Sequence, residues 1–75
     1  MAYSLRWCDA LLAAVLAKLF ADRQIIPRPD VIPYLVAHMD RSFESAARVV
    51  AALDRAALSE GRSLSRPLAI RVLDA

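Results

Sequence analysis

The sequence predicts an all-α fold, a small bundle of four helices in a single domain that covers residues 1–75. Three observations lead to this prediction. The chain has 75 residues, a length suited to one domain. It has one glycine, Gly61, although tight β-hairpins need residues that accept positive φ. Apolar residues recur at helical spacing in four stretches, which we place at about 4–23, 30–39, 42–60 and 66–73.

The first expected helix, residues 4–23 with Ser4 as its N-cap, is apolar around more than half of its circumference. One face follows helical spacing and is expected to enter the core: Leu5, Leu12, Leu16, Leu19 and Phe20. A second apolar strip lies beside it: Trp7, Leu11 and Val15. Because such a helix is buried on two sides or faces a partner, we predict that the second strip is partner-facing.

The second expected helix, residues 30–39, follows a connection that contains Pro27 and Pro29. These prolines remove backbone donors and favour extended geometry in the residues before them, so they separate the first two helices. Asp30 is the expected N-cap or first-turn acid. Pro33 fits the first turn because its missing N–H would have no helical partner there.

The third and fourth expected helices cover residues 42–60 and 66–73. The third has one apolar stripe, expected in the core: Phe43, Ala46, Val50, Leu53, Ala57 and Leu58. Gly61 stands where a left-handed residue ends a helix. Ser65 is the expected N-cap of the last helix, whose apolar face carries Leu68, Val72 and Leu73.

The residue types for catalysis and for metal or cofactor binding are missing. One glycine cannot form a phosphate-binding loop, and the lone Cys8 and lone His38 cannot make a zinc ligand set. No base partner is spaced near His38, which we expect at a helix end, and Cys8 is expected to pack beside Trp7. We therefore expect a domain that is not an enzyme by itself and that has no cofactor and no metal.

Charge and hydropathy bear on location. The net charge is +2, and the arginines are spread from Arg6 to Arg71, which is typical of a solvated surface and disfavours nucleic-acid binding. Residues 10–17 form an apolar stretch that is too short to span a membrane. The acidic Asp9 at its start makes the stretch a poor signal peptide. We expect a cytoplasmic protein that is not associated with a membrane.

Short sequence pieces from residue 9 onwards follow one another without a gap in a recognisable order. They are Ala14-Val15-Leu16 with Phe20, Asp30-Val31, Tyr34-Leu35, Met39-Asp40-Arg41, Ala52-Leu53-Asp54-Arg55-Ala56, and Arg62-x-Leu64-Ser65-x-Pro67 leading to Leu73. In these pieces the chain resembles the lid subdomain of the AAA+ module of DnaA and, more closely, of its regulatory relative Hda. The resemblance implies a four-helix AAA+ lid and a role in regulating bacterial chromosomal replication initiation, in which an Hda-type protein engages the sliding clamp and promotes ATP hydrolysis on DnaA.

The resemblance also implies a nucleotide-contacting position. In that family the lid folds over a nucleotide held by an α/β subdomain, and an arginine early in the third lid helix, sensor 2, reaches the phosphates. Aligning Asp40-Arg41 places Glu44 at this position, where a carboxylate would repel phosphate. Arg41 and Arg48 lie about one turn to either side and could replace sensor 2, or they could be solvated surface arginines.

The partner is expected to be a protein. Apolar residues make up 59% of the chain, and a domain of this size has too few interior positions for all of them. A lid without its AAA+ core would expose the strip that packs against that core, and Met1–Cys8 lies outside the resemblance, which favours a lid fragment or a short open reading frame. The candidate partners are the AAA+ α/β subdomain, DnaA, or a second copy of this chain in a homo-oligomer.

Two other functions stay open at this point. One is a helix-turn-helix DNA-binding module built from the second and third helices, because residues 40–42 have the right length for the turn. Glu44 stands in its recognition helix where base-reading residues are wanted, which disfavours it. The other is a self-associating helical module unrelated to replication, in which the first helix pairs with its own copy through Leu11 and Val15.

Overall fold

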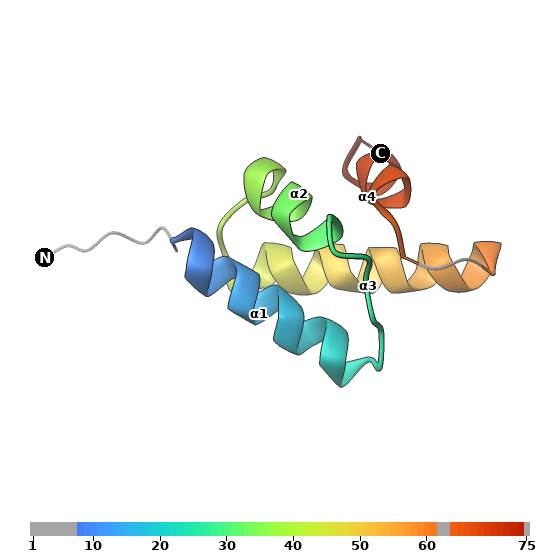
Figure 1. Cartoon of the computed structure of the whole chain (residues 1–75), viewed down its shortest axis with the longest axis horizontal. Helices are drawn as coiled ribbons and strands as arrows, with labels where there is room; N and C mark the ends of the chain where they lie inside the picture. The colour runs from blue at the N-terminus through green and yellow to red at the C-terminus, as the bar shows by residue number, and fades with distance from the viewer. Residues whose placement is uncertain (1–7, 62–63, 75) are drawn as a thin grey trace, which may run out of the picture.

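The structure, a computed structural model, describes residues 8–61 and 64–74, and this part of the chain forms helices and no strand (Figure 1). The helices are α1 (Asp9–Asp22), α2 (Val31–His38), α3 (Phe43–Glu60) and α4 (Arg66–Asp74). The prediction of an all-α, four-helix bundle is confirmed. In Figure 1, α3 runs along the length of the molecule, with α1 below it and α2 and α4 above it.

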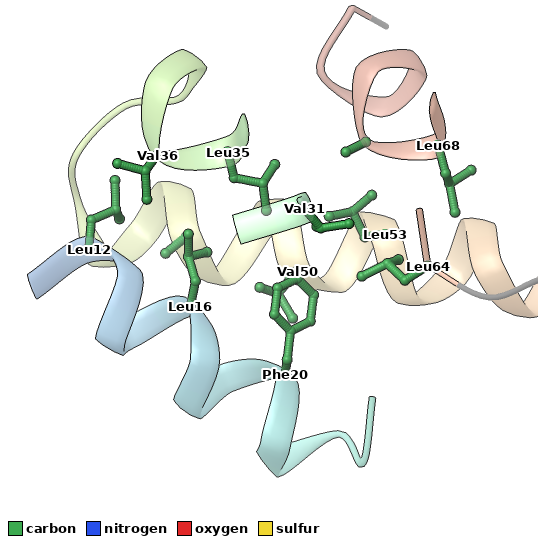
Figure 2. Close-up of a cluster of buried hydrophobic side chains, with 12 residues drawn as sticks. Leu12, Leu16, Phe20, Val31, Leu35, Val36, Val50, Leu53, Leu64 and Leu68 are labelled. Atoms are coloured by element: carbon green, nitrogen blue, oxygen red, sulfur yellow. The ribbon is translucent and has the colours of Figure 1, made fainter. Parts of the chain in front are cut away.

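The helices pack in a closed cycle around one core. α1 packs against α2 and α3, and α4 packs against the same two helices. Figure 2 shows that buried side chains of all four helices meet between the helices. The buried apolar residues are Leu12, Leu16, Phe20, Val31, Leu35, Val36, Ala46, Val50, Leu53, Leu64, Leu68 and Ala69. Their burial supplies the main free energy that holds the helices together, because apolar area removed from water is the dominant favourable contribution to folding.

The predicted core face of α1 is confirmed at its described positions. Leu12, Leu16 and Phe20 are at most 1% exposed, and Leu19 is half-buried against the core. Leu5 lies outside the described residues. The prediction is correct at these positions because residues three or four apart in the sequence lie on the same side of a helix.

The predicted core stripe of α3 is wrong at both of its ends. Phe43 is 56% exposed and Leu58 is 76% exposed, although both continue the spacing of the buried residues between them. At 18 residues α3 is the longest of the described helices, and the shorter helices packed against it leave Leu58, near its C-terminal end, uncovered, whereas Phe43 is its first residue. Figure 1 shows the C-terminal end of α3 extending beyond the other helices.

The start of α1 lies later than the expected residue 4. The helix begins at Asp9, and Cys8 before it has an extended backbone with φ of −74° and ψ of 166°. Ser4, the expected N-cap, lies outside the described residues. The expectation that Cys8 packs is wrong, because this residue precedes the helix and its side chain is exposed.

α1 ends in a turn that was not predicted from its sequence. Gln24 adopts φ of 59°, in the left-handed region that glycine usually occupies after a helix. The backbone N–H of Ile25 donates to the carbonyl of Phe20 at 2.9 Å, and that of Gln24 donates to the carbonyl of Ala21 at 2.9 Å. Ile25 packs against the core, so the turn directs the chain from the end of α1 towards α2.

The start of α3 is capped by a side chain, whereas the start of α2 is not. Asp30 occupies the N-cap position of α2, but its side chain makes no capping hydrogen bond, because its backbone is helical and not extended as capping requires. Ser42 is extended, and its Oγ accepts the N–H of Ser45 at 3.1 Å. Gly61 ends α3 with φ of 62°, as predicted.

Candidate protein-interaction surface

The outer strip of α1 is only partly covered by the rest of the fold. Leu11 is 44% exposed, whereas Val15 is half-buried and packs against the core. Trp7, the third predicted member, lies outside the described residues. The other exposed positions of α1 are alanines and charged residues: Asp9, Ala10, Ala14, Ala17, Lys18, Ala21 and Asp22. Leu11 is therefore the apolar side chain that α1 presents most openly to a partner.

Arg41 joins three helices at one corner of the bundle. Its Nη1 lies 2.5 Å from Oδ1 of Asp9, at the start of α1. Its Nη2 donates to the backbone carbonyl of Val36, near the end of α2, at 3.3 Å. Arg41 itself directly precedes the N-cap of α3. With a side chain only 27% exposed, it is anchored within the fold.

Glu44 and Arg48 lie on the first two turns of α3, and both are exposed. Glu44 is the second residue of the helix, where a carboxylate interacts favourably with the positive end of the helix dipole. Arg48 lies one turn further, with its Nη2 at 3.5 Å from Oγ of Ser45. Between Glu44 and Arg48 themselves the structure forms no ion pair.

A cleft of about 480 Å³ opens between the end of α2, the first half of α3 and the end of α4. Its lining is mixed: His38, Met39, Asp40, Ser45, Arg48, Val49, Ala52, Val72 and Leu73. His38 is the last residue of α2, as expected, and the centroid of its ring lies 4.3 Å from the centroid of the Tyr34 ring. Among the described residues no group of three or more metal-ligating side chains gathers here or elsewhere.

A second exposed apolar surface lies at the other end of α3. Ile26 is 91% exposed and Leu58 is 76% exposed. A groove of about 440 Å³ lies at these residues, lined by Ile25, Ile26, Asp54, Ala57, Leu58, Gly61 and Leu64. This surface was not predicted from the sequence, because helical spacing placed Leu58 in the core and no pattern gave Ile26 a role.

Comparison with known families decides what this bundle is. The family model described as "Hda, lid domain" matches residues 9–73, which run from the first residue of α1 into the last turn of α4. The chain belongs to the Hda lid family. No curated protein and no solved structure matches it significantly. The predicted resemblance is confirmed, and the four helices are those of a lid subdomain of a DnaA/Hda-type AAA+ protein.

The Hda lid fold gives different surroundings to the three residues considered for the sensor-2 contact. All three lie at or just before the start of α3: Arg41, Glu44 and Arg48. Arg41 contacts Asp9 of α1 and the Val36 carbonyl of α2, whereas Arg48 contacts Ser45 of its own helix. The pairing of Arg41 with Asp9 joins residues far apart in the sequence, and no local pattern predicts it. No helix in the described residues has the length and apolarity needed to cross a membrane.

Proposed function

We propose that this Hda lid domain is a non-catalytic protein-interaction domain that acts in the cytoplasm in the regulation of bacterial replication initiation. The strip Trp7, Leu11 and Val15 is its partner-facing surface, and the partner is an AAA+ α/β subdomain or DnaA. The exposure of Leu11 carries this proposal, because the core face of its helix, with Leu12 and Leu16, is fully buried while Leu11 stays 44% exposed. Membership of the Hda lid family supports the link to replication.

We propose further that the domain does not sense nucleotide through the sensor-2 position. Glu44 at that position is exposed at the start of α3, where its charge favours the helix dipole and would repel a phosphate. Arg41 is held by Asp9 and by the Val36 carbonyl, so turning towards a phosphate would break both contacts. Arg48 is exposed, so its side chain can reach an anion more freely than that of Arg41.

Binding to the AAA+ module of DnaA from the same genome tests the surface. Isothermal titration calorimetry would compare the natural chain with Leu11→Glu, which places a charge at the centre of the proposed contact. Ala17→Glu is the matched control, because Ala17 is also exposed on α1 but lies on another side of the helix. We expect Leu11→Glu to weaken binding about tenfold or more, as burying an unpaired charge is costly. If both variants bind like the natural chain, the strip is not the interface.

The absence of sensor-2 activity has a separate test. A fluorescent ATP analogue titrated with the chain should show no binding that depends on Arg48. A loss of binding in Arg48→Ala, with Arg41→Ala unchanged, would show that Arg48 has taken over the phosphate contact and would contradict the proposal. The helix-turn-helix alternative is disfavoured, because the exposed carboxylate of Glu44 on the first turn of α3 would be repelled by DNA phosphates.

A further inference from the structure

The first turn of α1 precedes the part of the helix that the core holds. Asp9, Ala10 and Leu11 are exposed, and Leu12 is the first residue of α1 whose side chain is buried. The N-cap residue Cys8 makes no side-chain hydrogen bond to this end of the helix. A terminal turn without a cap or a buried side chain opens easily, because opening it breaks few contacts.

An ion pair joins this turn to the rest of the bundle. Oδ1 of Asp9 lies 2.5 Å from Nη1 of Arg41, and Figure 1 shows the start of α1 beside the start of α3. Arg41 is the better-held member of the pair, with a side chain that is 27% exposed against 75% for Asp9. Its Nη2 also donates to the Val36 carbonyl of α2. Arg41 therefore offers the first turn of α1 a cation that the fold itself holds in place.

We propose that Arg41 is a positioning residue for the partner-facing surface and that it keeps Leu11 in place through Asp9. The inference rests on the proposed function, and it adds that a residue outside the Leu11 strip controls the affinity of that strip. Leu11 and Asp9 share one turn, so opening the turn moves Leu11 from the side of the helix on which it meets a partner. A partner that needs the closed turn binds with an apparent affinity proportional to the closed fraction.

The effect is expected to be moderate. An exposed ion pair changes an equilibrium constant by about two- to fivefold, because water and salt compete with it. We expect Asp9→Asn to weaken binding to the AAA+ module of DnaA by about this factor. Leu11→Glu acts at the contact itself, so its expected loss of about tenfold or more stays larger.

A double-mutant cycle in isothermal titration calorimetry tests the proposal. It compares the natural chain with Asp9→Asn, with Arg41→Ala and with the double variant. Asp9→Asn should weaken binding in the natural chain and much less once Arg41 is replaced, because the ion pair can be lost only once. Asp22→Asn is the matched control: Asp22 pairs with Lys18 at 2.8 Å at the other end of α1, and its loss should leave binding unchanged.

Amide hydrogen exchange of the chain alone tests the ordering of the turn without any partner. The N–H of Leu12 donates to the Cys8 carbonyl at 3.0 Å and closes the first turn. Its exchange should become about two- to fivefold faster in Asp9→Asn and stay at the natural rate in Asp22→Asn. A general loss of stability would accelerate it in both variants, since each removes one exposed ion pair.

Two results would overturn the inference. Equal losses of affinity from Asp9→Asn in the two backgrounds would mean that Asp9 contacts the partner independently of Arg41. Unchanged exchange at Leu12 would mean that the ion pair does not order the turn. Leu11→Glu leaves the pair intact and tests the surface alone. Natural affinity in that variant would refute the proposed function, whereas natural affinity in Asp9→Asn with weakened Leu11→Glu would refute this inference alone.

Discussion

Leu16 and Leu11 lie on the same helix, and the fold places them in opposite environments. Leu16 is fully buried, whereas Leu11 is 44% exposed. We predict that Leu16→Ala lowers the free energy of unfolding by about 3 kcal/mol, because it removes buried carbon atoms and leaves a cavity among packed side chains. Leu11→Ala should lower it by less than about 1 kcal/mol, because much of that side chain is already in water.

The predicted loss at Leu16 is large for a chain of this size. At about 0.05–0.15 kcal/mol per residue, 75 residues correspond to about 4–11 kcal/mol of stability. With a urea slope of about 1 kcal/mol per molar for a small protein, Leu16→Ala should lower the unfolding midpoint by about 3 M. Leu11→Ala should lower it by less than about 1 M. Urea titration followed by far-ultraviolet circular dichroism measures both midpoints directly.

Equal shifts for the two variants would refute this account of α1. A larger loss for Leu11→Ala would mean that the Leu11 strip is the core side of the helix, and the proposed partner surface would fail with it. Leu16→Met serves as a volume-conserving control and should cost less than about 1.5 kcal/mol, which would identify the cavity as the cause of the larger loss.

Three further predictions concern helix ends and the corner at Arg41. Ser42→Ala should cost about 1 kcal/mol because the capping acceptor is lost, while Ser42→Asp keeps an acceptor and should be near neutral; equal melting temperatures for the two would contradict the cap. Gln24→Gly should raise stability by up to about 1 kcal/mol, because Gln24 holds φ of 59° at a cost that glycine avoids, and an unchanged or lower melting temperature would contradict this. Arg41→Ala should destabilise more than Asp9→Asn in urea titrations, because it removes a hydrogen bond to α2 as well as the shared ion pair; equal losses in the two variants would contradict a contribution from that hydrogen bond.

Helix ends show how far local chemistry predicts this fold. Gly61 and Ser42 occupy the end and the start of α3, and each residue type prefers its position whatever surrounds it. Gln24 ends α1 in the same backbone region as Gly61, although glutamine has no such preference. The hydrogen bond from Ile25 to Phe20 and the packing of Ile25 stabilise that turn, so it depends on the core and could not be predicted locally.

The candidate surfaces show the same division. Helical spacing predicted that Leu11 and Val15 form a strip beside the core face, but only the packed bundle shows that Val15 is half-covered while Leu11 is not. The ion pair between Arg41 and Asp9 likewise could not be predicted from the sequence, because it depends on how the start of α1 packs beside the start of α3. These contacts support the proposal that Arg41 has a structural role.

By itself, the sequence determined the all-α class, the four helices, the buried face of α1 and the family to which the chain belongs. The class, the helices and the buried face follow from local preferences and from the fixed period of the helix, which sets which residues share a face. The family follows from the resemblance of short sequence pieces between residues 14 and 73. Only the tertiary structure decided which apolar positions stay in water, as at Leu58, and which charged groups meet. The reason is physical: a repeating pattern fixes a side chain's direction on its own helix, whereas its burial depends on where the neighbouring helices begin and end.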